Sequence, residues 1–409
     1  MQSVNSRRSM LVLLIVSGLI ISICMGLRQS FGLFMRPITL ELGVSAAAFG
    51  FSVALQNIVW GLGQPVVGAI ADRFGARPVL VVTSVIYALG LMMITFARGE
   101  LGLDIAGFMM GVGVAGTGFG ILIGVVTRST PPERRSQTVG AVAAMGSLGT
   151  IVIAPLGQML VDGMGWRAGI MGFAAIAMLM MVLSFAIREP VVTDGAKGSG
   201  PPQSLREALV IAWRHRGFLA MTTAYFACGF QLIFITTHLP QYLELCGQAP
   251  SLGAAAMALI GLFNTIGTYS IGLMGARYSQ KRLLALIYLF RTIAIAAFIY
   301  FPVTPTSTLV FASVMGLLWL GVAPLVTVIV SRMFGLLHFN MLYGLAFLWH
   351  QVGSFFGAWI GGAVFDWTGR YDWAWIALMV IGAIAFTLQW RMDDRPAEAH
   401  RPASAPVPA

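Results

Sequence analysis

Long apolar stretches alternate with short polar segments along almost the whole chain. Each stretch holds about 20 residues, the length of helix that crosses the roughly 30 Å hydrocarbon core of a bilayer. None shows the ten-residue alternation of apolar and polar positions that is typical of a transmembrane barrel strand. The pattern therefore predicts an all-α membrane protein with twelve transmembrane helices. The expected spans are 10–35, 46–70, 79–97, 104–127, 138–162, 168–187, 217–243, 252–275, 283–301, 307–331, 341–365 and 373–391.

The composition also indicates a membrane protein. Apolar residues make up 58% of the 409 positions, and Asp, Glu, Lys and Arg only 10%. Soluble domains carry about 25% charged residues, so this chain has too few to cover a soluble surface of its size. Its 48 glycines are tolerated better by transmembrane helices than by soluble ones. A soluble enzyme, a secreted disulfide scaffold and a disordered chain are therefore excluded.

Residues that carry catalysis or bind metals are sparse. Cys24, Cys228 and Cys246 have no zinc-type spacing and cannot form a disulfide framework. There is no nucleophile–base pair and no phosphate-binding loop, so we expect neither enzyme activity, nor a metal, nor a cofactor. The first apolar run, Met10–Leu27, is too long for the hydrophobic region of a signal peptide and lacks a cleavage site.

The distribution of Lys and Arg predicts the orientation. The net charge of +10 does not indicate a nucleic-acid partner, because the basic residues are concentrated in alternate loops. With the N-terminus inside, 19 of the 25 basic residues lie in cytoplasmic segments, which is the positive-inside signal. We expect a multi-pass protein of the inner (plasma) membrane, with both termini cytoplasmic and no partner subunit. The outer loops hold only Arg36, Arg98, Arg167 and Arg370.

One long polar connection divides the chain. Residues 188–216 begin with a Gly/Pro/Ser-rich segment, typical of a flexible linker, and end in a short amphipathic stretch, typical of an interfacial helix. The expected units are therefore an N-terminal six-helix bundle (1–187), this cytoplasmic linker and a C-terminal six-helix bundle (217–391). The Pro- and Ala-rich tail, 392–409, is expected to be disordered.

The two bundles are related by a repeat of 204 residues. Asp162 aligns with Asp366 and Arg128 with Arg332 at this offset. Charged pairs at one common offset are not expected by chance in a chain with so few charges. Parallel repeats of this kind place a substrate site between the halves near the midplane. Further aligned pairs are Cys24 with Cys228, Gly140 with Gly344, Gly149 with Gly353, Gly157 with Gly361 and Gly165 with Gly369.

The loop between the second and third spans carries a motif. GAIADRFGAR at Gly68–Arg77 resembles the signature loop of the major facilitator superfamily, G-x3-D-R-x-G-x-R. GLMGARYSQK at Gly272–Lys281 is a degenerate copy of this motif in the second half, with Ala276 at the position where Asp is usual. The resemblance covers nearly the whole chain and implies the major facilitator fold, with two halves that rock about a central site.

The resemblance further implies that this loop is a conformational latch on the cytoplasmic side. Asp72 is placed to pair with the basic residues beside it or with nearby helix ends. Plain positive-inside topology is the alternative explanation. The expected latch residues are Gly68, Asp72, Arg73, Gly75, Arg77, Arg277 and Lys281.

Charged residues within the spans are functional candidates because burying them in a membrane is costly. No carboxylate lies mid-span, which favours anionic or neutral cargo over a cation. Arg28 lies deep in the first span and has no acid within two helical turns. A guanidinium binds a carboxylate or a phosphate by two parallel hydrogen bonds. Arg28 is therefore the main candidate ligand, and snorkelling to the outer surface is the alternative.

The segment Leu27–Pro37 resembles the first span of organic-anion carriers. Monocarboxylate transporters carry a Lys near the position of Arg28, and organophosphate/phosphate antiporters carry an Arg. The chain resembles the bacterial monocarboxylate and oxalate/formate antiporter group, which implies that Arg28 holds a substrate carboxylate. Those families often carry a second cation in span eight, where this chain has Asn264 and Thr268. One cavity cation favours a monoanion over a dicarboxylate.

The same resemblance implies that spans ten and eleven line the cavity, so Trp319, Trp349 and His350 are expected at the site. His350 either carries a coupled proton, because imidazole titrates near neutral pH, or binds a neighbouring helix. Gln56 is a candidate because the oxalate antiporter has a Gln in that span. Gln231 is a weaker one, since Gln and Asn often serve only to join helices in lipid.

Three further polar residues lie within spans. Asn57 is expected to join helices. Arg291 is expected to pack near Tyr288 or to snorkel, and His238 to lie at the outer interface.

Two functions compete. The first is a secondary carrier for a small organic anion, most specifically a monocarboxylate, moved with a proton or exchanged for another anion. The second is a multidrug/proton antiporter of the same fold. Exporters of that kind typically carry an Arg in span four, where this chain has Gly107, and a Gly-Pro motif in span five, where Ala154 precedes Pro155.

Overall fold

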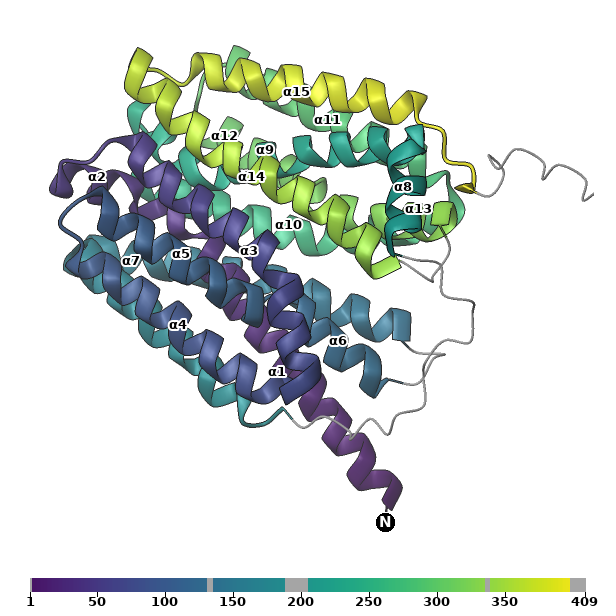
Figure 1. Cartoon of the computed structure of the whole chain (residues 1–409). Coiled ribbons are helices and arrows are strands. Elements are labelled where there is room, and N and C mark those ends of the chain that lie inside the picture. Colours follow the sequence, from purple (N-terminus) through teal and green to yellow (C-terminus); the bar gives the residue numbers. More distant parts are fainter. Residues whose placement is uncertain (1, 131–134, 188–204, 335–338, 398–409) are drawn as a thin grey trace, which may run out of the picture.

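The computed structural model describes residues 2–130, 135–187, 205–334 and 339–397, which are helical and contain no strand (Figure 1). The predicted all-α class is confirmed. The helices are α1 (Gln2–Gln29), the 3-10 helix η1 (Phe31–Phe34), α2 (Met35–Leu42), α3 (Ala46–Phe74), α4 (Ala76–Phe96), α5 (Glu100–Thr117), α6 (Phe119–Ser129), α7 (Arg135–Ser184), α8 (Leu205–Arg214), α9 (Arg216–Leu245), α10 (Pro250–Arg277), α11 (Gln280–Tyr300), α12 (Pro305–Leu317), α13 (Val322–Phe334), α14 (Phe339–Thr368) and α15 (Asp372–Arg391).

Length and hydropathy single out ten spans among the described residues, two fewer than the twelve predicted. One reason is that Ala144–Ser184 counts once, although 41 helical residues are about 60 Å long, twice the bilayer core. The chain turns back at Gly165, where φ is 81°, and this stretch makes two crossings. The other reason is α14, which is 30 residues long but contains His350 and Gln351, and these lower its mean hydropathy.

Residues 204 positions apart make equivalent contacts. In α7, the backbone of Gly149 lies against the carbonyl oxygen of Ser22 in α1, and in α14 Gly353 lies against that of Phe226 in α9. A Cβ at either glycine would collide with that oxygen. The repeat seen in the sequence is thus present in space as two pseudo-symmetric six-helix halves.

Two crossings are interrupted near their middle. The fourth breaks at Gly118, between α5 and α6, and the tenth breaks between α12 and α13. Arg291 of α11 donates hydrogen bonds to the carbonyl oxygens of Leu318 and Trp319 in the second break. These carbonyls have no helical partner, so the buried guanidinium replaces the missing donors. Arg291 therefore packs inside its own half rather than snorkelling.

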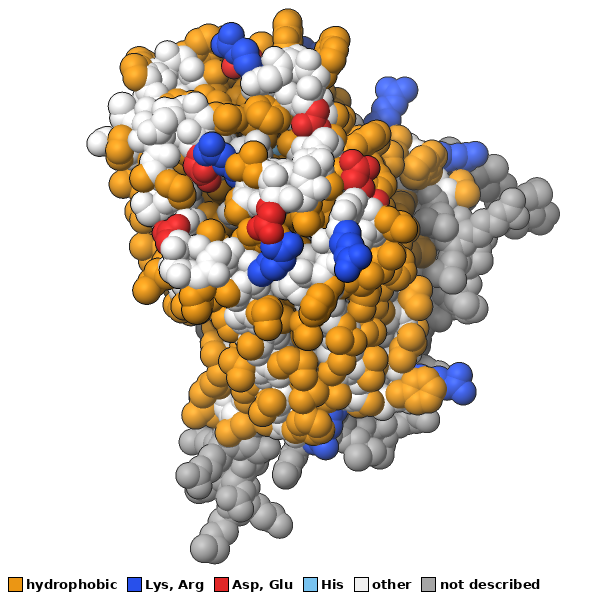
Figure 2. Space-filling view, turned by 90° about the vertical axis from the view of Figure 1, so that its left-hand side faces the viewer, with side chains coloured by type: hydrophobic (Ala, Val, Ile, Leu, Met, Phe, Trp, Pro, Cys, Tyr) orange, Lys and Arg blue, Asp and Glu red, His pale blue; other side chains and the backbone are white. Residues whose placement is uncertain are grey.

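We call the end of the bundle that contains the start of α1 and the end of α15 the terminal end. The other end, which includes Arg36 and Asp366, is the opposite end, and there the two halves are in contact. The Asp366 carboxylate in α14 accepts hydrogen bonds from the backbone N–H groups of Ala46 (3.0 Å) and Ala47 (2.6 Å) at the start of α3. Arg36 in α2 pairs with Glu244 in α9 at 2.5 Å. Figure 2 shows acidic and basic side chains gathered on this end above apolar flanks.

Among the described residues, glycines at the terminal end of both halves face open space. Gly68, Gly272 and Gly344 lie there on α3, α10 and α14, and a Cβ added at any of them would have no atom within 4 Å. Nearer the opposite end, by contrast, a Cβ at Gly50 of α3 would collide with the backbone of Ala358 of α14. The described structure is therefore closed at the opposite end and open at the terminal end.

Candidate functional site

Arg28 lies near the end of α1 and faces α3. Its Nη1 donates to the side-chain oxygen of Asn57 at 3.2 Å, and its guanidinium carbon lies 5.1 Å from the centre of the Trp60 ring. Asn57 is oriented for this contact because its amide nitrogen donates to the carbonyl oxygen of Val53 at 2.8 Å. The guanidinium thus lies on one face of α3, where residues three apart are neighbours.

This face of α3 contains donors without acceptors. Arg28 Nε and Trp60 Nε1 are both buried and have no hydrogen-bond partner among the described residues. A buried donor without an acceptor is destabilising by about 1–3 kcal/mol. A guanidinium and an indole N–H placed together, with no carboxylate bonded to either, are complementary to an anion.

Two amide side chains connect this face to the second half. Gln351 of α14 donates from Nε2 to the carbonyl oxygen of Asn57 at 3.0 Å, so its Oε1 is the acceptor that lies 3.0 Å from His350 Nδ1. The hydrogen bond therefore requires the His350 proton on Nδ1, which leaves Nε2 with a free lone pair. His350 can accept a further proton at Nε2 without losing the bond to Gln351.

Aromatic rings surround this cluster. The Trp60 ring meets Phe347 of α14 edge-on at 5.2 Å, a contact between the halves. Phe347 stacks on His350 at 5.9 Å, and Tyr225 of α9 lies 4.7 Å from His350 on another side. An apolar wall with few polar groups is the usual lining of a small-molecule site.

Asn264, predicted in place of a second cation, has a structural set of bonds. Its amide nitrogen donates to Ser147 Oγ of the other half at 2.7 Å, and its oxygen accepts from Thr268 Oγ1 and from the Leu320 backbone N–H, both at 3.0 Å. Asn264 therefore joins the halves and holds the break between α12 and α13. Trp319 lies in that break, 2% exposed.

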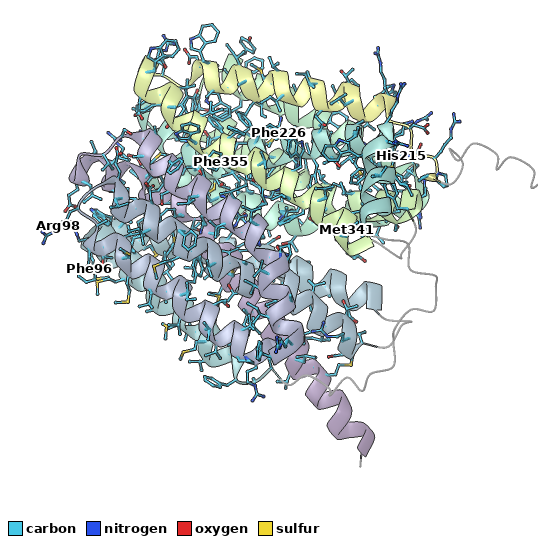
Figure 3. The ribbon with its side chains drawn as sticks, in the orientation of Figure 1. Phe96, Arg98, His215, Phe226, Met341 and Phe355 are labelled. Carbon is cyan, nitrogen blue, oxygen red and sulfur yellow. The ribbon has the colours of Figure 1, made fainter. Side chains whose placement is uncertain are left out.

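The other predicted site residues make no hydrogen bond to Arg28 in the part of the chain that the structure describes. Gln231 donates to the carbonyl oxygen of Leu378 at 3.1 Å and so joins α9 to α15. Trp349 is 43% exposed and lies 6.3 Å from the Phe226 ring. Gln56 is buried and has no hydrogen bond among the described residues. Figure 3 shows Phe226 within the second half.

The interfacial position expected for His238 is wrong. The ring is fully buried, with Nε2 2.7 Å from the carbonyl oxygen of Ala358 and Nδ1 3.1 Å from the Tyr371 hydroxyl. Both nitrogens are therefore used to join α9 to α14 and to the loop before α15.

The predicted latch residues make contacts only within their own halves in the described structure. Gly75 ends α3 with φ of 89°. Arg77 donates to the carbonyl oxygen of Ile187 at 3.0 Å, Arg73 lies over the Phe74 ring, and Lys281 lies 3.7 Å from Asp394. The Asp72 side chain lies outside the described part. The absence of a cross-half contact agrees with the open terminal end.

Sequence reasoning missed Trp60 and Gln351, and it took Asn57 to be structural. A signal for Trp60 was available, because Trp60 aligns with Asn264 at the 204-residue offset. For Gln351 there was none, since its partner is a backbone oxygen of the other half. No group of three or more His, Cys, Asp or Glu among the described residues could hold a metal ion.

Residues 10–336 match the family described as the Major Facilitator Superfamily. Monocarboxylate transporter 13 of Rattus norvegicus is 24% identical over 349 residues, which are 85% of this chain and 80% of that protein. The oxalate:formate antiporter of Oxalobacter formigenes is 24% identical over 390 residues, 92% and 89% of the two chains.

One similar solved structure is a bacterial homologue of the human lysosomal transporter Spinster, in an inward-facing and unoccupied conformation. It has a TM-score of 0.76 and 16% identity, and the match covers 95% of this chain and 98% of that one. At this identity the likeness concerns the fold alone. It agrees with twelve crossings in two halves.

Proposed function

Because the chain belongs to the major facilitator superfamily, we propose that it is a secondary active transporter of a small organic anion, most specifically a monocarboxylate. The family and the transporter relatives make it a membrane transporter and not an enzyme. The named cargoes of the relatives, monocarboxylates and the oxalate/formate pair, support an organic anion.

The arrangement around Arg28 carries the proposal. A substrate carboxylate would accept hydrogen bonds from the Arg28 guanidinium and from Trp60 Nε1, which both have buried nitrogens without a partner among the described residues. Phe347 and Tyr225 would contact its organic part. A single arginine in this cluster matches a single carboxylate.

We propose that His350 carries the coupled proton, on its free Nε2. The chain of bonds from Arg28 through Asn57 and Gln351 to His350 crosses from one half to the other. A substrate bound to Arg28 would therefore act on both halves, which is what coupling to rocking requires. Exchange for a second anion is the alternative mode for the same site.

The orientation follows the loop charges. We place the protein in the inner membrane with both termini in the cytoplasm. The terminal end then faces the cytoplasm, and the described structure is open on that side. The boundaries 1–187 and 217–391 for the two bundles, with the linker between them, belong to the same proposal, as does a monomeric carrier.

The deciding experiment is uptake into proteoliposomes. The panel contains labelled monocarboxylates, dicarboxylates, a sugar and a cationic dye, with and without an inward proton gradient and with and without anion inside. We expect monocarboxylate uptake, stimulated by the gradient or by internal anion. Arg28→Gln should raise KM about 10- to 150-fold, the loss of one charge-assisted hydrogen bond of about 1.5–3 kcal/mol.

The control is Arg282→Gln, which removes an exposed arginine at the terminal end of α11 and should leave uptake unchanged. Unaltered KM in Arg28→Gln would refute the binding role of Arg28. Dye transport without anion transport would favour the multidrug antiporter instead.

A further inference from the structure

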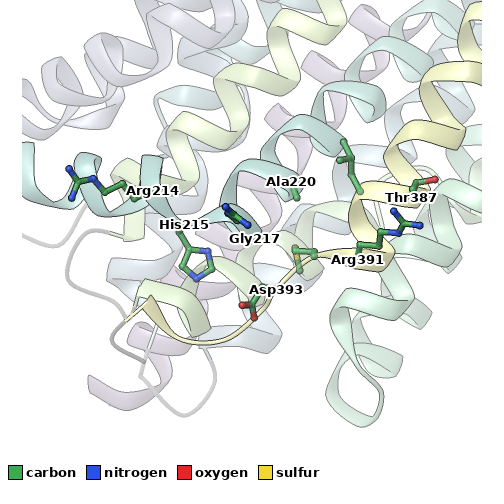
Figure 4. Close-up of a pocket in the computed structure, with 10 residues that line it drawn as sticks. Arg214, His215, Gly217, Ala220, Thr387, Arg391 and Asp393 are labelled. Atoms are coloured by element: carbon green, nitrogen blue, oxygen red, sulfur yellow. The ribbon is translucent and has the colours of Figure 1, made fainter. Parts of the chain in front are cut away.

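A cavity that contains three arginines lies at the terminal end, away from Arg28. It has a volume of about 590 Å³ and lies between the start of α9 and the end of α15 (Figure 4). Arg214, Arg216 and Arg391 line it. The transport mechanism proposed above uses none of these residues.

Among the described residues the three arginines have no partner, whereas the other polar side chains that line the cavity do. None of the three guanidiniums has a hydrogen bond or an ion pair in the described part of the chain. The Asp393 carboxylate accepts from the backbone N–H of Arg395 at 3.2 Å and lies 3.5 Å from its Nε. Counted over the described residues that line the cavity, three guanidiniums against one carboxylate give an excess of positive charge.

His215, also in the cavity, has a hydrogen bond at each ring nitrogen. Its Nδ1 accepts from the backbone N–H of Phe218 at 3.1 Å, so the proton lies on Nε2, which donates to the carbonyl oxygen of Arg395 at 3.1 Å. The ring thereby holds the segment after α15 against the start of α9. The segment after α15 therefore forms one side of the cavity.

The cavity opens onto the outer face of α15. Val380 (53% exposed), Ile384 (52% exposed), Thr387 and Arg391 follow at intervals of four, three and four residues and share this face. On a membrane-spanning helix, exposed apolar residues face acyl chains. Arg391 therefore lies at the depth where the acyl chains of a lipid end and its headgroup begins.

Two tryptophans beside the cavity also indicate that it lies at the depth of the lipid headgroups. Trp213 of α8 and Trp390 of α15 are 64% and 49% exposed. Tryptophan is enriched at the level of the headgroups, and basic pockets beside transmembrane helices bind anionic headgroups. A soluble anion would account for the arginines, but not for the apolar face that leads into the cavity.

We propose that this cavity binds the phosphate of an anionic phospholipid of the phosphatidylglycerol type, with its acyl chains along Val380 and Ile384. Arg216 and Arg391 hold the phosphate, and Arg214 is at the edge. The leaflet is the cytoplasmic one in the orientation proposed above. Lipid binding itself is independent of which substrate the transporter carries.

Native mass spectrometry of the full chain in detergent tests this, by titration with phosphatidylglycerol or with phosphatidylcholine. The variant Arg216→Gln/Arg391→Gln is compared with Arg277→Gln/Arg282→Gln, which removes the same charge from exposed arginines at the same end, outside the cavity. At about 1 kcal/mol per arginine near a headgroup, we expect the cavity variant to bind phosphatidylglycerol about thirtyfold more weakly. The control should bind as the wild type does.

Equal affinity for the two lipids in the wild type would overturn the proposal, as would an equal loss in both variants. Retention of labelled inorganic phosphate by lipid-free protein, lost only in the cavity variant, would assign the cavity to a soluble anion instead. Arg391→Lys, which keeps the charge, should retain more phosphatidylglycerol binding than Arg391→Gln. A monodisperse elution profile for each variant shows that it is folded.

Discussion

Arg28 and His350 belong to different halves, and two amide side chains connect them. The bond from Gln351 Nε2 to the Asn57 carbonyl determines which atom of Gln351 faces His350, and so which imidazole nitrogen is free. The proton relay that we propose at His350 therefore depends on Gln351, the next residue along the chain. It is a property of the pair and not of His350 alone.

Replacing His350 with Gln tests this relay. The new amide can still donate to Gln351 Oε1 but cannot take up a proton near neutral pH. We expect gradient-driven uptake to lose its dependence on the proton gradient, while exchange between internal and external anion persists. The measurement is tracer flux in proteoliposomes at several external pH values.

His238→Gln is the matched control, since His238 is buried with both nitrogens bonded within its own half. It should lower thermal stability and leave the proton dependence intact. A proton dependence that survived in His350→Gln would remove His350 from the coupling mechanism.

Helix pairs in this fold are set by where small residues allow backbones to touch. Gly353 of α14 lies against a carbonyl oxygen of α9, whereas Gly344, nine residues earlier on the same helix, faces open space. The sequence shows both simply as glycines that align with partners in the first half. Only the packing distinguishes a contact that must stay small from one that need not.

Gly353→Ala and Gly344→Ala form a matched pair on one helix. The methyl group at Gly353 has to push α9 and α14 apart, and overpacking of this kind costs about 1–3 kcal/mol. At Gly344 the same change should be neutral or favourable by up to about 1 kcal/mol, because alanine favours helix over glycine. Thermal unfolding in detergent is the measurement, and similar midpoints for the two variants would contradict the packing described here.

The molecule as a whole is held in one of its two expected states by polar contacts at the opposite end. Asp366 binds the positive end of the α3 dipole across the boundary between the halves, and Arg36 pairs with Glu244 across the same boundary. Both contacts must break before that end opens. They therefore favour the state that is open at the terminal end.

Asp366→Asn should shift this equilibrium. A carboxylate at a helix N-terminus contributes about 0.3–1 kcal/mol, so we expect the population open at the opposite end to rise up to about fivefold. Spin labels at Phe96 and Tyr300, which are 75% and 78% exposed on the two halves, would report a longer distance. Asp372→Asn, which breaks only the local pair with Arg370, should leave the distances as they are.

The amino-acid sequence alone determined the class, the crossings, the repeat and the position of Arg28 deep in a span with no acid nearby, because these depend on local composition and spacing. The tertiary structure decided what surrounds that arginine. The rotation of α3 and α9 places Asn57 and Trp60 beside Arg28 and directs Gln231 toward α15. That rotation follows from contacts between backbones far apart in the chain, such as Gly353 with Phe226, and a pattern of neighbours along the sequence does not encode it.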